Sequence, residues 1–232
     1  MMRKIIVLFI ALSFSFNCLA QGVIPKDIRN IGDQVDLDRM QAADGSRYIN
    51  VKGSPYLTDV FVPATVYPDD DLFFVKYNAV DDEIEVKLSA TKTIILDNSF
   101  KKYIIVFKES GETFTTLDDA LNNKPAYFID VKKTDNVSLY KKKTKDFIQA
   151  TKATDNYSKD KPAHFSKLEE VFYIQLTPEG PAKRISKKKK SFLAMFKNNL
   201  NDIKYFIGVN KIKLTKEEDL IELISFINNL KK

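Results

Sequence analysis

The amino-acid sequence predicts an α+β protein, in which a large antiparallel β-meander is followed by a C-terminal helical hairpin. Two observations support this prediction. About eight to ten short segments with strand character follow one another between residues 48 and 176, separated by turns. This pattern is typical of a barrel, a half-barrel or a sandwich. After Pro181 the apolar residues change to helical spacing, which predicts a separate helical region.

Residues 1–20 have the layout of a secretory signal peptide. Two basic residues precede an apolar run, and Ala20 provides a small residue at the expected cleavage site. The run is short for a transmembrane helix, although a membrane anchor is an alternative. Lipidation of Cys18 requires a small residue before it, and Asn17 stands there instead. We therefore expect an exported mature chain without a lipid, a cysteine or a transmembrane segment.

The predicted antiparallel β domain covers residues 21–182, and its clearest element is a hairpin. Apolar and polar residues alternate along both 72–79 and 83–89, and a period of two places successive side chains on opposite faces of a strand. The short polar segment 78–82 suits the connection between these strands. We expect the apolar face to be buried and Glu85 to lie on the solvent face.

The other predicted elements of the β domain follow from shorter patterns. Residues 59–67 predict an edge or bulged strand, because Pro63 has no N–H to donate. The continuous apolar run 103–107 predicts a strand buried on both faces. One helical turn is expected at 117–122 and a surface loop at 151–166. The remaining predicted strands are 48–51, 93–96, 112–116, 127–131, 137–140, 147–150 and 171–176.

Residues 183–232 form a predicted basic helical appendage. They contain thirteen Lys or Arg and five Asp or Glu, a net charge of +8, whereas the whole chain carries +6. Apolar residues at helical spacing predict a helix over 216–230, with Thr215 and Glu218 as a capping box. A run of four cations precedes the helices and is the candidate contact with an anionic partner; the alternative is a solvated lysine-rich helix. These cations are Lys187, Lys188, Lys189 and Lys190.

The sequence contains no recognisable motif for catalysis, a cofactor or a metal. The acidic runs 69–71 and 81–83 lack the alternating ligands and the glycine of a calcium loop. His164 is the only histidine, and no glycine pattern for nucleotide binding is present. We therefore expect no enzyme activity, no cofactor and no metal. A single basic run without interleaved aromatic residues, in an exported chain, also argues against nucleic acid.

Several short motifs resemble a family of uncharacterised secreted proteins of the Bacteroidota. The matching segments are PYL at 55–57, TVY at 65–67, KYN at 76–78, DEIEV at 82–86, KKK at 188–190, EEDLI at 217–221 and NNL at 228–230. Family members usually have glycine before the TVY motif, whereas this chain has Ala64. The resemblance implies an exported envelope protein. It implies no activity and no site residues.

These observations predict a non-catalytic interaction module in the periplasm or the outer envelope. The expected contact is the basic C-terminal region, and the expected partner is an envelope protein or an anionic surface of lipid or polysaccharide. The alternative is a periplasmic carrier of a lipid-like amphiphile. It rests on the 17 Phe and 10 Tyr, some of which would then line an apolar groove in the sheet.

Overall fold

The structure is a computed structural model that describes residues 47–68, 70–99, 103–153, 159–196 and 198–230. The expected signal peptide 1–20 and the segment 21–46 lie outside the described residues. Three helices are described, namely α1 (Lys189–Leu193), α2 (Leu200–Val209) and α3 (Glu217–Leu230). The twelve described strands are β1 (Val62–Tyr67), β2 (Asp71–Asn78), β3 (Glu83–Lys87), β4 (Thr93–Ile95), β5 (Ile104–Phe107), β6 (Thr113–Asp119), β7 (Lys124–Lys132), β8 (Ser138–Thr144), β9 (Phe147–Ile148), β10 (His164–Phe165), β11 (Glu169–Gln175) and β12 (Ala182–Arg184).

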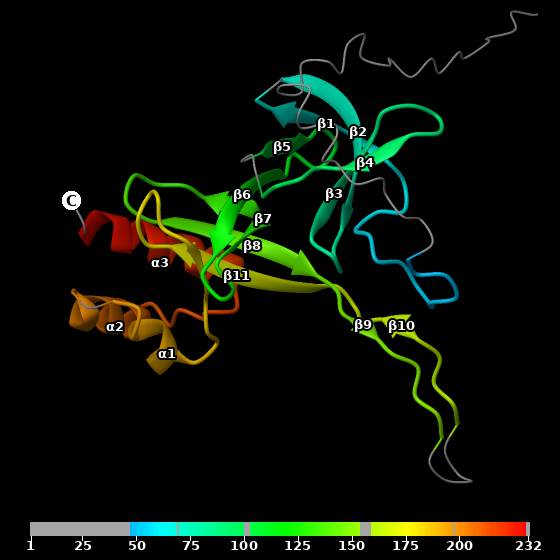
Figure 1. Cartoon of the computed structure of the whole chain (residues 1–232). Helices are drawn as coiled ribbons and strands as arrows, with labels where there is room; N and C mark the ends of the chain where they lie inside the picture. The colour runs from blue at the N-terminus through cyan, green and yellow to red at the C-terminus, as the bar shows by residue number, and fades with distance from the viewer. Residues whose placement is uncertain (1–46, 69, 100–102, 154–158, 197, 231–232) are drawn as a thin grey trace, which may run out of the picture.

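The strands form a closed barrel with further strands attached. Ten of them lie in one sheet, in the order β12-β11-β8-β7-β6-β5-β1-β2-β3-β4. β12 also pairs in parallel with β6, through Ala182 and Asp119, so β6, β7, β8, β11 and β12 close into a five-stranded barrel. β5 and β1 to β4 continue the sheet away from the barrel (Figure 1). The predicted α+β class, with a β-meander and a helical tail, is confirmed.

The barrel interior is filled by side chains. Phe128 and Tyr173 pack with ring centroids 4.9 Å apart, and Tyr140 donates a 3.0 Å hydrogen bond to the Gln175 side chain. Ala126 and Ala182 belong to the same buried cluster. Alternation along each strand explains this set, since every second residue of a barrel strand points inward.

A second core lies between the barrel and the attached strands. It contains the apolar residues of the predicted hairpin, where Val75 pairs directly with Val86. Tyr127 of β7 belongs to this core, whereas its neighbour Phe128 belongs to the barrel interior. β7 therefore contributes one face to each core.

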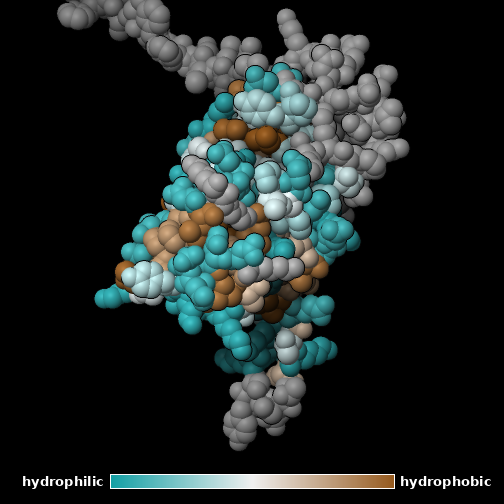
Figure 2. All heavy atoms as spheres, turned by 90° about the vertical axis from the view of Figure 1, so that its left-hand side faces the viewer, coloured by the Kyte–Doolittle hydropathy of each residue, from teal (hydrophilic) through white to brown (hydrophobic). Residues whose placement is uncertain are grey.

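The helices cover the outer face of β8 and β11. Leu139 and Ile174 from these strands form one buried cluster with Phe192 of α1, Ile207 of α2 and Ile224 of α3. Figure 2 shows apolar and polar side chains intermixed on the side that carries the helices. The basic helical region thus shares a core with the barrel and is not a separate layer.

Several predicted elements differ from those observed. β1 lies inside the sheet between β2 and β5, and is not an edge strand. Pro63 is tolerated because it lies at the end of the β1–β5 pairing, where Lys108 N–H donates to its carbonyl. β5 alternates between exposed and buried residues, so it is buried on one face only. The predicted turn of helix at 117–122 is wrong, because β6 continues to Asp119.

Three further predictions were also wrong. Residues 47–50 form a turn and not a strand. Glu85 is only 7% exposed, since Tyr56 O–H donates to its carboxylate at 2.7 Å. The capping box does not form: the Asp219 carboxylate instead accepts a 2.7 Å hydrogen bond from Lys213 N–H, and so ties the preceding loop to the first turn of α3.

Residues 145–153 and 159–166 form a projecting arm, which contains the described part of the predicted surface loop 151–166. β9 and β10 pair at its base, and Figure 1 shows it extending away from the side that carries the helices. Phe147 and Phe165 from the arm surround Tyr48, with ring centroids 5.8 and 5.0 Å from it. This aromatic contact joins the arm to the first described residues.

Candidate functional site

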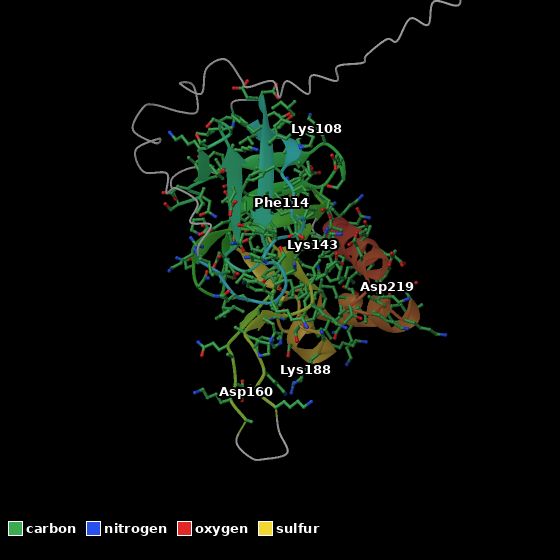
Figure 3. The ribbon with its side chains drawn as sticks, turned by 90° about the vertical axis from the view of Figure 1, so that its right-hand side faces the viewer. Lys108, Phe114, Lys143, Asp160, Lys188 and Asp219 are labelled. Carbon is green, nitrogen blue, oxygen red and sulfur yellow. The ribbon has the colours of Figure 1, made fainter. Side chains whose placement is uncertain are left out.

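The basic segment, residues 183–190, runs from the end of β12 into the start of α1. Its six cations are exposed, and none of them forms an ion pair with another described residue. They are Lys183, Arg184, Lys187, Lys188, Lys189 and Lys190. The structure therefore brings the four lysines predicted as a contact together with two further cations, and Lys188 can be found beside α1 in Figure 3.

The backbone of the basic segment is anchored at both ends. Ile185 is 6% exposed and Phe192 is fully buried. Ile185 N–H also donates to the Phe172 carbonyl of β11 at 2.8 Å. The lysine side chains between these anchors consequently extend from a fixed chain, while the apolar residues around them are used in the core.

The lysines at the start of α1 do not stabilise this helix. Lys188 precedes the helix in an extended conformation without a side-chain cap, and the first turn contains no acidic residue. A helix N-terminus carries partial positive charge, so cations there are unfavourable. Helix stability therefore does not explain Lys187, Lys188 and Lys189, whereas Lys190 lies in the last turn of α1, where a cation is favourable.

A groove of about 540 Å³ runs beside the basic segment. We call it the β11 groove. Its apolar floor comes from Val171, Phe172, Ile185 and Leu214, and its rim carries Glu169, Glu170, Arg184 and Lys187, with Ser186 and Thr215 completing the lining. Lys187 is thus a predicted contact residue that also lines a hollow, which the sequence pattern did not indicate.

A second hollow, of about 560 Å³, lies at the β2–β3 turn. Its lining is polar and mixed in charge, and the residues that line it are Asp81, Asp82, Glu83, Ile95, Leu96, Asp97, Asn98, Ser99, Asn122, Lys124, Pro125, Ala126 and Lys142. We call it the polar hollow. Asp82 belongs to the predicted hairpin connection 78–82, yet it is substantially covered, with 21% of its side chain exposed.

Asp82 joins the hairpin turn to the barrel. Its carboxylate accepts hydrogen bonds from Tyr77 O–H at 2.7 Å, Tyr127 N–H at 3.2 Å and Lys142 Nζ at 2.7 Å. Tyr127 needs this acceptor because the β7–β8 pairing begins only at Ile129. Burial raises the pKa of Asp82, and the attraction of Lys142 opposes that rise.

A further polar cluster holds the other side of the same turn. Arg47 pairs with Asp81 at 2.9 Å and with Glu83 at 3.0 Å, and Tyr48 O–H donates to Asp81 at 2.8 Å. Burial, followed by the hydrogen bond to Asp81, raises the pKa of Tyr48 to about 12. Asn78 donates to Asp81 and accepts from two backbone N–H groups of the turn. The charges of Arg47, Asp81 and Glu83 therefore compensate one another within the cluster.

Comparisons of the chain with protein-family models, with curated proteins and with solved structures found no match. Within the described residues, no helix is both long enough and apolar enough to cross a membrane. The same residues contain no group of three or more His, Cys, Asp or Glu side chains arranged to hold a metal ion. His164, the single histidine, lies in β10, where its ring Nδ1 is 3.0 Å from the Pro162 carbonyl oxygen.

Proposed function

We propose that this protein is an exported, non-catalytic envelope protein that binds an anionic partner through the basic segment. The observation that carries the proposal is the set of six exposed cations without an ion pair among the described residues. Their backbone is anchored in the core while their charges face solvent. Such a surface attracts anions over a distance of about one Debye length, roughly 8 Å at 0.15 M salt.

The expected partner belongs to the envelope. Residues 1–20 have the pattern of an export signal, and the resemblance to secreted proteins of the Bacteroidota points to the same compartment. Anionic lipid, anionic polysaccharide and an acidic protein surface all occur there. The partner is thus one of these three, in the periplasm or at the outer envelope.

The filled barrel favours this proposal over a carrier of a lipid-like amphiphile. The interior between the five barrel strands is occupied by Phe128, Tyr140 and Tyr173. The polar hollow is lined mainly by charged and amide side chains, whereas sites for apolar ligands are lined mainly by hydrophobic residues. The aromatic residues that suggested a groove are largely core residues.

The engagement of the acidic side chains supports a non-catalytic role. A general acid or base must have its proton-transfer position available to a substrate. Asp82 is instead surrounded by three donors, and Asp81 and Glu83 are bound to Arg47. These carboxylates hold the turn together.

Sedimentation with anionic vesicles and with anionic cell-wall polysaccharide tests the proposal. The variant replaces Lys187, Lys188, Lys189 and Lys190 with Gln. The control variant replaces four exposed lysines outside the basic helical region with Gln, namely Lys92, Lys108, Lys132 and Lys152. We expect wild type and control to bind one of the two surfaces, with binding that weakens as salt rises from about 0.01 to about 0.15 M, and the first variant to bind at least tenfold less. Equal binding by both variants would overturn the proposal.

A further inference from the structure

The β11 groove contains an open strand edge. β11 pairs with β8 over its whole length, but it pairs with β12 only from Tyr173 to Gln175. One further backbone hydrogen bond, from Ile185 N–H to the Phe172 carbonyl, is the last between β11 and the chain that follows β12. Beyond it the basic segment diverges from β11, and the groove occupies the space between them.

The direction of the free backbone groups follows from this last bond. The Phe172 carbonyl points toward the β12 side, and backbone groups alternate in direction along an antiparallel strand. The N–H and C=O of Glu170 therefore also point to that side, where no described strand continues the pairing. A strand edge of this kind is a template for an added strand.

The walls of the groove suit an extended peptide. Its floor includes Val171 and Leu214, which can receive an apolar side chain. Arg184 and Lys187 at the rim have no ion-pair partner among the described residues. Glu169 and Glu170 line the same groove, so its lining carries two carboxylates and two cations. The excess positive charge lies directly beside the groove, on the exposed side chains of Lys188, Lys189 and Lys190 in the basic segment.

We propose that the β11 groove binds an extended acidic segment of a partner protein as an added strand along Glu169–Phe172. This inference rests on the proposed function and identifies its partner as a protein. Backbone hydrogen bonds to β11 provide the affinity of such a contact, and the pockets beside the edge provide its selectivity. Arg184 and Lys187 bind the acidic side chains, and the floor receives the apolar residues between them.

The test uses a pool of nonapeptides with glutamate at alternate positions and mixed apolar residues between them. A second pool has the same sequences with N-methylated backbone amides, which retain the charge but cannot pair as a strand. We expect the full-length protein to bind the first pool at least tenfold more tightly than the methylated one. Equal binding of the two pools, or no binding of either at low salt, would overturn strand addition.

Two variants of the same residue give the matched comparison. Glu170→Pro removes the outward N–H, which β8 does not use, so an edge proline is tolerated. Glu170→Ala keeps that N–H. We expect the proline variant to lose at least tenfold in binding and the alanine variant to bind at least as well as wild type. The thermal midpoint of each variant confirms that it is folded; equal binding by the two folded variants contradicts the proposal.

The charge variant separates the two proposals. With Lys187–190 replaced by Gln, weaker binding of both pools alike supports an anionic partner while rejecting strand addition. Undiminished binding of the first pool to this variant counts against the proposed function itself. Binding of vesicles or polysaccharide without binding of peptides also rejects strand addition and leaves an anionic surface as the partner.

Discussion

At the residue scale, Asp82 shows how a charged side chain connects two parts of the fold. It lies at φ 59° in the β2–β3 turn, and it accepts hydrogen bonds from a tyrosine, a lysine and a backbone N–H. Hydrogen bonds from three donors offset much of the free energy that burial of the charged carboxylate costs. Removing it leaves three donors without an acceptor, and an unsatisfied buried donor is costly.

Asp82→Ala should therefore lower the free energy of unfolding by about 3 kcal/mol. Asp70→Ala is the matched control, because Asp70 is exposed, also has a positive φ of 57°, and forms no side-chain hydrogen bond or ion pair with another described residue. The control carries the same backbone strain and should cost only about 1 kcal/mol. Urea unfolding of both variants gives the comparison. Equal losses would show that the hydrogen bonds of Asp82 contribute nothing.

The tyrosines predict a loss of stability at alkaline pH. Burial raises the pKa of Tyr77 and of Tyr127 well above 10, the ordinary value for tyrosine. Above pH 10 the unfolded chain releases these protons while the folded chain keeps them. Since the folded state then holds more protons, its stability falls as pH rises. Unfolding by urea from pH 9 to about pH 11 should show this fall, with phenolate absorbance appearing together with unfolding.

Replacing these two tyrosines with Phe provides the control for the loss of stability at alkaline pH. Tyr77→Phe removes one titrating group, so the slope of stability against pH above 10 should decrease, although the stability itself is lower at neutral pH because Asp82 loses a donor. Tyr127→Phe should reduce the slope in the same way. An unchanged slope in both variants would mean that other groups cause the loss.

At the element scale, β12 is the strand that completes the barrel. It has only three residues, yet it pairs with β11 on one side and with β6 on the other. Ala182 is fully buried against the aromatic residues of the interior, whereas Lys183 next to it is exposed. A small residue is needed at Ala182 because Phe128 and Tyr173 fill the space.

Ala182→Asp should unfold the barrel. An unpaired carboxylate there costs more than the roughly 5–15 kcal/mol of stability that a domain of this size has. Lys183→Asp introduces the same side chain one residue later, on an exposed position, and should change the unfolding free energy by about 0.5 kcal/mol or less. Circular dichroism and thermal melts of the two variants decide this. A native melt for Ala182→Asp would mean that β12 does not close the barrel.

The hairpin and the last helix illustrate how much of the fold the sequence predicts. Period-two alternation identified β2 and β3 correctly, and helical spacing identified α3 to within one residue. β12 was missed because three residues, AKR, carry no period. Glu85 was misplaced because its partner, Tyr56, lies in an irregular segment before the sheet. Alternation of apolar and polar residues predicts which side chains share a face of a strand, but it does not predict which residues cover that face.

The candidate site was predictable only in part. Four consecutive lysines are visible as a charge run, and the structure places all of them at the surface. The groove beside Lys187 was not predictable, because it depends on where β12 separates from β11. The role of Asp82 was equally hidden, since Lys142 and Tyr127 are distant from it in the chain. Contacts between residues that are distant in the sequence leave no pattern in the neighbouring residues.

At the scale of the whole molecule, the basic helical region and the barrel form one unit. Val137 and Leu139 of the barrel share a buried cluster with Leu220, Leu223 and Ile224 of α3. Asn228 of α3 also accepts a 2.9 Å hydrogen bond from Thr134 O–H in the β7–β8 turn. The barrel thus needs the helices to cover its outer face, and the helices position the basic segment.

Different residues of the tail therefore serve the fold and the proposed binding. The apolar residues of α1 and α3 are buried in the core, whereas the cations of the basic segment are exposed. Removing the entire tail would expose the core of β8 and β11, so a truncation cannot report on binding. The charge of the basic segment must be changed in the full-length chain.

A pull-down from envelope extract with the full-length protein is the most direct test of the proposed role. Wild type and the variant with Lys187–190 replaced by Gln are compared at low and at moderate salt. The variant with Lys92, Lys108, Lys132 and Lys152 replaced by Gln is the charge-matched control. We predict an anionic envelope component that is recovered with wild type and control at low salt, is lost at moderate salt, and is not recovered with the Lys187–190 variant. Recovery of the same component with all three proteins, regardless of salt, would contradict a binding role for the basic segment.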